Sequence, residues 1–238
     1  MHWAKVNLRS KIKQQCILCA GKDTSGTGIC QACIADLARS RYRCPKCALP
    51  LTYSTEANCS RCQQKPPTYQ QCFSCLDYDF PISQLLSQIK HNNHPEWIPA
   101  LATLMSNQPP PSEITQNAQL IPVPMHRTQL NERGFNQAEI LSRHLSKATG
   151  ITTNCNIVKK VKNTQKQKEL SSTQRKRNLA GAFESKPIDG GTFIIIDDVM
   201  TTGATVNELT RTLLNQGADR VYIWVLARTP AAFWPHNS

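Results

Sequence analysis

Residues 193–205 read Phe193-Ile-Ile-Ile-Asp197-Asp198-Val-Met-Thr201-Thr202-Gly203-Ala204-Thr205. The continuous apolar run at the start is typical of a strand that is buried on both faces, so we expect it near the centre of a sheet. The strand ends in two acids, and a turn of small residues then leads into an apolar stripe at helical spacing. The stripe consists of Val206, Leu209, Leu213 and Leu214, and Gly217 ends it. The stretch therefore predicts a strand, a tight turn and a helix in succession.

Strands and helices also alternate elsewhere in this half of the chain. Residues 120–123 form a short apolar run, and residues 137–148 place apolar side chains on one helical face before Gly150. Residues 221–226 form the last apolar run. Short strands that alternate with helices predict an α/β domain with a mostly parallel sheet and helices on both of its faces.

The turn after the two acids has the composition of a phosphate site. Free N–H groups at a turn and at a helix N-terminus surround a phosphate dianion without needing a lysine. Hydroxyl groups add hydrogen bonds, and glycine lets the backbone approach the ligand closely. The hydroxyls belong to Thr201, Thr202 and Thr205, and the glycine is Gly203. A phosphorylated sugar is the ligand that this turn suits.

Asp197 and Asp198 lie at the carboxyl end of the predicted strand, where open α/β sheets bind their ligands. One or both carboxylates can accept hydrogen bonds from ribose hydroxyls, and one can hold Mg²⁺ directly or through water. The alternative is an acidic pair that only caps the following helix, since aspartate and threonine favour such positions.

Ten of the eleven cysteines occur as Cys-x-x-Cys pairs that begin at residues 16, 30, 44, 59 and 72. The chain opens without the apolar core of a signal peptide, and cytosolic thiols stay reduced, so the pairs indicate metal rather than disulfides. Two such pairs complete a tetrahedral zinc site with four thiolates. An iron–sulfur cluster held by the same thiolates is an alternative, and a redox dithiol is a weaker one.

Five pairs cannot all be used two at a time, so one pair must remain off the metal. The pair Cys72 and Cys75 runs into a bulky, strand-like segment, where cysteine behaves as a small buried hydrophobe. We therefore assign the other four pairs to two structural zinc ions with no open coordination position. Zinc 1 would take Cys16, Cys19, Cys30 and Cys33, and zinc 2 would take Cys44, Cys47, Cys59 and Cys62.

The length of 238 residues suits one medium and one small domain. We divide the chain into a double zinc-ribbon module over residues 1–67 and an α/β domain over residues 68–238, with a linker at residues 63–69 that contains Pro66 and Pro67. No apolar stretch is long enough to span a membrane, so we expect a cytoplasmic protein. The net charge of +12 favours a polyanionic partner, although any single basic cluster can equally be a solvated face.

Residues 159–177 form a basic segment, with Glu169 as its single acid. We expect a mobile loop that either closes over a departing pyrophosphate or contacts a DNA backbone, and a solvated excursion without a ligand is the alternative. Its basic residues are Lys159, Lys160, Lys162, Lys166, Lys168, Arg175, Lys176 and Arg177. Residues 90–94 follow a helical stretch, and we expect their histidines to be surface residues rather than ligands.

The stretch at residues 193–205 resembles the 5-phosphoribosyl 1-pyrophosphate (PRPP) motif of type I phosphoribosyltransferases. Together with residues 121–124, 133–137, 174–183 and 226–229, it resembles the ComF family of competence-associated proteins over nearly the whole chain. Members of this family pair a double zinc ribbon with such a domain. The cysteine pair at residues 72 and 75 departs from the family pattern.

The resemblance implies magnesium-bound PRPP as the ligand. It places Asp197 and Asp198 at the ribose, as the catalytic residues if the protein is an enzyme, and the turn at the 5-phosphate. The loop after Pro124 would then meet the pyrophosphate, with Arg133 as its leading basic residue. The full set of PRPP-binding residues is Asp197, Asp198, Met200, Thr201, Thr202, Gly203, Ala204, Thr205 and Arg133.

Two classes of function remain open. In one, the protein transfers ribose 5-phosphate from PRPP to a nitrogenous acceptor. In the other, which we favour, it is a DNA-uptake or DNA-utilisation factor that contacts single-stranded DNA and uses PRPP as a ligand or signal, with possible partners among DNA-uptake proteins at the inner face of the membrane. Fold alone does not decide function. This preference depends on the family resemblance, on the positive charge and on the expected lack of a C-terminal hood that would recognise a base.

Overall fold

A five-stranded parallel sheet forms the centre of the protein, for which a computed structural model describes residues 15–22, 26–164 and 179–231. All neighbouring strands pair in parallel, in the order β3-β9-β8-β4-β5. The strands are β3 (Cys72–Asp77), β9 (Arg220–Arg228), β8 (Thr192–Met200), β4 (Ala118–Pro122) and β5 (Thr152–Thr153). The predicted α/β sheet is confirmed, and the apolar run at residues 193–196 lies in its middle strand.

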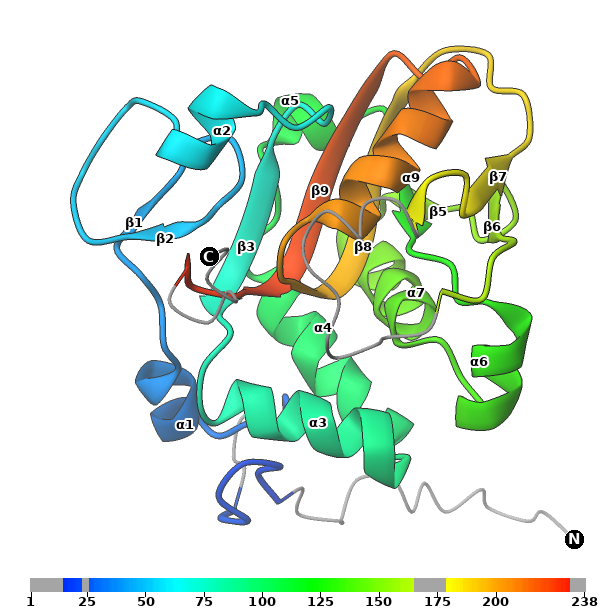
Figure 1. Ribbon diagram of the computed structural model, residues 1–238. Helices are drawn as coiled ribbons and strands as arrows, with labels where there is room; N and C mark the ends of the chain where they lie inside the picture. The colour runs from blue at the N-terminus through cyan, green and yellow to red at the C-terminus, as the bar shows by residue number, and fades with distance from the viewer. Residues whose placement is uncertain (1–14, 23–25, 165–178, 232–238) are drawn as a thin grey trace, which may run out of the picture.

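Helices cover both faces of the sheet, as predicted (Figure 1). Alternate side chains of β8 point to opposite faces, so Ile194 and Ile196 join one buried cluster while Phe193 and Ile195 join another. The first cluster includes side chains of α3 (Ile82–Asn92), α4 (Ile98–Ser106) and α7 (Gln137–Thr149). The second includes side chains of α9 (Ala204–Asn215). Each helix therefore buries its apolar stripe against the sheet.

The remaining elements are short and connect or flank this core. They are α1 (Gln31–Asp36), β1 (Tyr42–Arg43), β2 (Pro50–Leu51), α2 (Ser60–Gln64), the 3₁₀ helix η2 (Pro95–Trp97), α5 (Ser112–Thr115), α6 (Arg127–Arg133), β6 (Val158–Lys160) and β7 (Phe183–Ser185). None of the helices in the described ranges has the length and apolar character needed to cross a membrane.

Two element boundaries differ from the prediction. Strand β8 runs past the acids to Met200, because its pairing with β9 continues to Arg228. Both acids therefore lie within the strand. The basic segment begins as a strand and not as a loop, because Lys159 and Lys160 belong to β6, which pairs antiparallel with β7. Residues 165–178 of that segment lie outside the described residues.

The two cysteine units pack on opposite faces of the sheet. Cys16 of the first unit joins the cluster of α3 and α4, and a side chain at Gly28 would come within 2.9 Å of the Ala100 Cβ atom. Cys44 of the second unit joins the cluster of α9. Tyr69, at the end of the expected linker, is buried against the same cluster. Each cysteine unit thus shares apolar packing with the α/β domain.

Candidate functional site

A cleft of about 950 Å³ lies at the carboxyl edge of the sheet and brings most of the predicted ligand residues together. The acid pair of β8, the turn before α9 and the end of α6 all line it. Its predicted members are Asp197, Asp198, Thr201, Thr202, Ala204, Thr205 and Arg133. Residues from four separate parts of the fold also line it, namely Tyr78, Lys90, Gln137 and Lys160.

The turn between β8 and α9 has the backbone geometry that its composition predicts. Gly203 adopts φ 76°, a left-handed conformation that favours glycine, and immediately precedes the first residue of α9. The N–H of Ala204 donates to Thr202 Oγ1 at 3.4 Å. Within the described ranges, no residue accepts a hydrogen bond from the N–H groups of Thr202 or Gly203. Two donors of the turn are therefore available to an anion.

A buried lysine neutralises one member of the acid pair. Lys90 Nζ, from the last turn of α3, lies 2.7 Å from Asp198 Oδ2, and both side chains are largely buried. Burial lowers the pKa of Lys90, but the charge of Asp198 outweighs this effect and raises the pKa above its ordinary value. The ammonium group therefore stays charged in the cleft.

Within the described part of the chain, Asp197 forms no ion pair like that of Asp198. Burial raises the pKa of its carboxyl, and the neighbouring negative charge of Asp198 raises it further, while Lys90 opposes both effects. A cation bound beside Asp197 would oppose both effects and favour its ionised form. Carboxylate oxygens are donors that a hard cation such as Mg²⁺ prefers, so the two acids fit this ion.

The start of α7 supplies a third set of polar groups. Asn136 caps this helix, since its Oδ1 accepts from the N–H of Ala138 at 3.1 Å. Gln137, the first residue of α7, accepts a hydrogen bond from Arg133 at 2.8 Å through its Oε1. Its Nε2 is buried and has no partner among the described residues, although the side chain lines the cleft. Buried donors are rarely left unsatisfied, so Gln137 is a candidate ligand contact that sequence reasoning missed.

Several predicted site residues lie elsewhere. Met200 is buried behind the turn, where its sulfur lies 3.7 Å from the Cys72 sulfur, and Gly203 does not line the cleft. Lys159 pairs with Glu184 on the surface, and Lys162 donates to the Ala180 carbonyl. The other basic residues of the expected loop lie outside the described ranges, namely Lys166, Lys168, Arg175, Lys176 and Arg177.

The structure brings the eight predicted metal ligands together in two groups of four. In each group, the sulfur atoms all lie within 4.8 Å of one another. The Sγ atoms of Cys19 and Cys30 are 3.8 Å apart, as are those of Cys47 and Cys59. Four thiolates in a tetrahedron around zinc, at bond lengths of roughly 2.3 Å, would be separated by about 3.8 Å. Both groups therefore fit zinc.

The thiols of the second group differ in acidity, because burial raises the pKa of Cys47 and of Cys62 whereas the pKa of Cys44 is lowered. Burial disfavours ionisation of the Cys44 thiol, but backbone N–H groups outweigh this effect and lower its pKa. One of these is the N–H of Cys59, whose nitrogen lies 3.3 Å from the Cys44 sulfur. Cys72 and Cys75 belong to neither group, because both are buried in β3.

The phosphoribosyl transferase domain family matches residues 130–236 of this chain. The parallel sheet, the acid pair at the cleft and this match together define a phosphoribosyltransferase-type domain. Among solved structures, the glutamine PRPP amidotransferase of B. subtilis aligns with 52% of this chain and 25% of its own, at 15% identity and a TM-score of 0.36.

The chain also resembles curated proteins over most of its length. It is 37% identical over 207 residues to the DNA utilization protein YhgH of Escherichia coli K12, which covers 85% of this chain and 91% of that protein. It is 33% identical over 225 residues to Competence protein F of Haemophilus influenzae, with 90% and 96% covered. Competence protein ComFC of Bacillus subtilis is 28% identical over 198 residues, with 79% of each chain covered. The protein belongs to the ComF family of competence and DNA-utilisation proteins.

Proposed function

We propose that the cleft binds PRPP with Mg²⁺ and that the protein is a DNA-utilisation factor controlled by this ligand. One observation carries the proposal: Thr202, whose N–H group has no partner among the described residues, lines the same cleft as the two carboxylates of β8. The N–H groups of the turn suit a phosphate dianion, and the carboxylates suit ribose hydroxyls.

The three parts of PRPP would bind to three parts of the cleft. The turn, residues 201–205, would hold the 5-phosphate, and Asp197 and Asp198 would accept hydrogen bonds from the ribose. Arg133 and the unpartnered amide of Gln137 would face the pyrophosphate. Mg²⁺ bound by Asp197 or Asp198, directly or through water, would supply positive charge between the carboxylates and the pyrophosphate.

The two cysteine groups would hold zinc as structural ions. All four positions of a tetrahedral ion would be taken by protein sulfur, so no position would remain for chemistry. Binding of zinc would stabilise segments whose helices and strands are too short to fold on their own.

Single-stranded DNA is the polymer that we propose as partner. The net charge is +12, and Lys160 lines the cleft at the start of the basic segment. Backbone phosphates would pair with such lysines in a salt-dependent manner. The relatives named for DNA utilization and competence support a role in the uptake or use of DNA. The proposal places this role on the cytoplasmic side, together with other uptake proteins.

The size of the cleft favours one alternative. Its volume of about 950 Å³ extends past the acids to Tyr78, Asn163 and Leu179, which leaves room beside a sugar phosphate for a further group. In this alternative, a nitrogenous acceptor would bind there and take the ribose 5-phosphate, with release of pyrophosphate.

A binding titration tests the proposal. The affinities for Mg²⁺-PRPP and for single-stranded DNA would be measured over a range of salt for the parent protein, for an Asp197→Asn/Asp198→Asn variant and for the control Asp189→Asn, which removes an exposed acid. We expect the double variant to lose PRPP affinity while its DNA affinity persists and falls with salt.

Two results would change this conclusion. Equal PRPP affinity in the parent and the double variant would exclude the cleft as the binding site. Release of pyrophosphate from PRPP in the presence of a nucleobase would favour the transferase, and a parent that does not bind DNA would remove the DNA role.

A further inference from the structure

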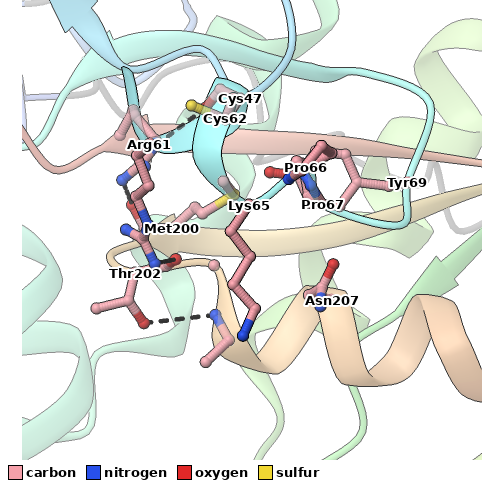
Figure 2. Close-up of a pocket in the computed structure, with 13 residues that line it drawn as sticks. Cys47, Arg61, Cys62, Lys65, Pro66, Pro67, Tyr69, Met200, Thr202 and Asn207 are labelled. Atoms are coloured by element: carbon pink, nitrogen blue, oxygen red, sulfur yellow. Dashed lines mark hydrogen bonds between the residues drawn. The ribbon is translucent and has the colours of Figure 1, made fainter. Parts of the chain in front are cut away.

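Two arginines hold the turn of the cleft from behind. Arg61 Nη2 donates to the Thr202 carbonyl at 2.9 Å. Arg228 Nη1 donates to the Met200 carbonyl at 2.8 Å and also to the Thr201 carbonyl. Figure 2 shows Arg61 reaching from α2 to Thr202, with Met200 lying close by. Three successive carbonyls, those of residues 200–202, therefore accept hydrogen bonds from guanidinium groups.

Both arginines are tied to the second cysteine group. Arg61 lies in α2 between Cys59 and Cys62, two of the four clustered cysteines. Arg228 ends β9, is 1% exposed, and donates through Nε to the Cys47 carbonyl at 3.0 Å. The same guanidinium group thus joins a cysteine turn to the turn of the cleft.

The geometry of the peptide bond gives these contacts a consequence for the ligand. A trans peptide is planar, so the C=O of one residue and the N–H of the next point in opposite directions. Arginines that draw the carbonyls of Thr201 and Thr202 to one side therefore turn the N–H groups of Thr202 and Gly203 to the other side. These are the two unpaired donors described above.

A third tether fixes the first turn of α9. The N–H of Thr68 donates to Asn207 Oδ1 at 2.8 Å, and the Thr68 hydroxyl donates to the same atom at 2.9 Å. The chain that leaves α2 is thereby attached to the helix whose N-terminus faces the proposed phosphate. The turn and the helix are both held by residues that follow or adjoin the second cysteine group.

We propose that Arg61 is a positioning residue that transmits the geometry of the second cysteine group to the phosphate turn, and so sets the affinity for a sugar 5-phosphate. The inference rests on the proposed function, because it assumes that the turn binds the 5-phosphate of PRPP. Arg61 acts through the Thr202 carbonyl and does not touch the ligand. Loss of its hydrogen bond would free the Thr202–Gly203 peptide to rotate, and the two donors would no longer be aligned.

The experiment compares four zinc-loaded proteins: the parent, Arg61→Met, Arg61→Lys and the control Arg41→Met. Arg41 is an exposed arginine in the same cysteine unit, and its guanidinium group lies over the Tyr42 ring. Calorimetric titration with ribose 5-phosphate probes the turn, and titration with Mg²⁺-pyrophosphate probes the other end of the cleft. Native mass spectrometry counts the bound zinc ions.

We expect Arg61→Met to weaken the binding of ribose 5-phosphate about tenfold. A hydrogen bond from a charged group contributes enough free energy to change an affinity by about this factor or more. Pyrophosphate affinity and the zinc count should not change, Arg61→Lys should recover part of the loss, and Arg41→Met should match the parent.

The outcomes separate the two proposals. If the parent does not bind ribose 5-phosphate, the assignment of the turn as a phosphate site fails. If the parent binds and Arg61→Met binds equally well, the positioning role of Arg61 is wrong. The positioning role would also be wrong if Arg61→Met weakened the binding of pyrophosphate equally or lost a zinc ion. The arginine would then support the whole domain or the cysteine unit.

Discussion

The ammonium group of Lys90 lies 2.7 Å from the carboxylate of Asp198, although the two residues lie far apart in the chain and on different elements. The contact places a fixed positive charge at the centre of the proposed ribose site. It also makes Asp198 and Asp197 unequal, because Lys90 forms its ion pair with the first and, among the residues that the structure describes, no cation does so with the second. Two adjacent and chemically identical residues should therefore respond differently to substitution.

Replacement of Lys90 by methionine should destabilise the protein. Removal of one partner of a largely buried ion pair leaves the other charge uncompensated, which costs about 3 kcal/mol. Thermal unfolding without ligand should show a lower Tm, and Mg²⁺-PRPP should restore more stability to this variant than to the parent, since a cation again faces Asp198. Lys147→Met, which removes an exposed lysine of α7, is the control. A Lys90→Met variant as stable as the control would contradict the role given to the pair.

Asp197→Asn should instead stabilise the protein without ligand. The pKa of Asp197 is raised by burial and by the charge of Asp198, so the folded state binds a proton more tightly than the unfolded state. Stability should then be lost as the pH rises from about 3.8 toward about 8. Asparagine removes this loss, and we expect a gain on the order of 1 kcal/mol at pH 8 that disappears near pH 4.

Denaturant unfolding of Asp197→Asn and Asp198→Asn at both pH values checks this prediction. Asp198→Asn is the matched comparison, because it removes the partner of Lys90 and should destabilise the protein at pH 8. Both variants should bind Mg²⁺-PRPP poorly. The same change in stability for both substitutions at every pH would show that the two carboxyls are equivalent, contrary to the geometry.

Sequence alone predicted the parts of the site that are contiguous in the chain. The turn at residues 201–205 and the acids before it could be found because strand, turn and helix follow one another within a single stretch. The grouping of the eight cysteines followed from their spacing, since two residues between thiols suit one tight turn. Local chemistry was sufficient in both cases.

The contacts that orient the site could not be predicted in this way. The sequence assigned no role to Lys90, and its approach to Asp198 depends on how α3 packs against the sheet. Arg61 and Arg228 reach the turn because the second cysteine unit lies against the face covered by α9. Such contacts depend on tertiary packing, which hydrophobic periodicity does not specify. The one available signal was Arg228 itself, a charged residue at the end of an apolar strand.

Gln137→Met should weaken the binding of Mg²⁺-PRPP by about tenfold or more, because the ligand would lose one hydrogen bond and Arg133 would lose the acceptor that orients it. The Nε2 donor is buried at the cleft without a partner among the described residues, and methionine has a similar shape but cannot donate. Pyrophosphate affinity should fall with that of PRPP, whereas ribose 5-phosphate affinity should not. Gln116→Met, at an exposed position, serves as the control in the same titrations. Unchanged pyrophosphate affinity would remove Gln137 from the site.

The two cysteine groups should differ in their effect on the cleft, although both fit zinc equally well. Cys59→Ser and Cys19→Ser should each reduce the zinc count, measured by native mass spectrometry, from two ions to one. The second group is tied to the turn through Arg61 and Arg228, and the first packs on the opposite face of the sheet. Cys59→Ser should therefore weaken the binding of ribose 5-phosphate, whereas Cys19→Ser should bind this ligand about as tightly as the parent. Cys72→Ala is the control that should retain both ions, since Cys72 belongs to neither group. Equal loss of affinity in the two serine variants would mean that zinc stabilises the whole protein and does not act through the turn.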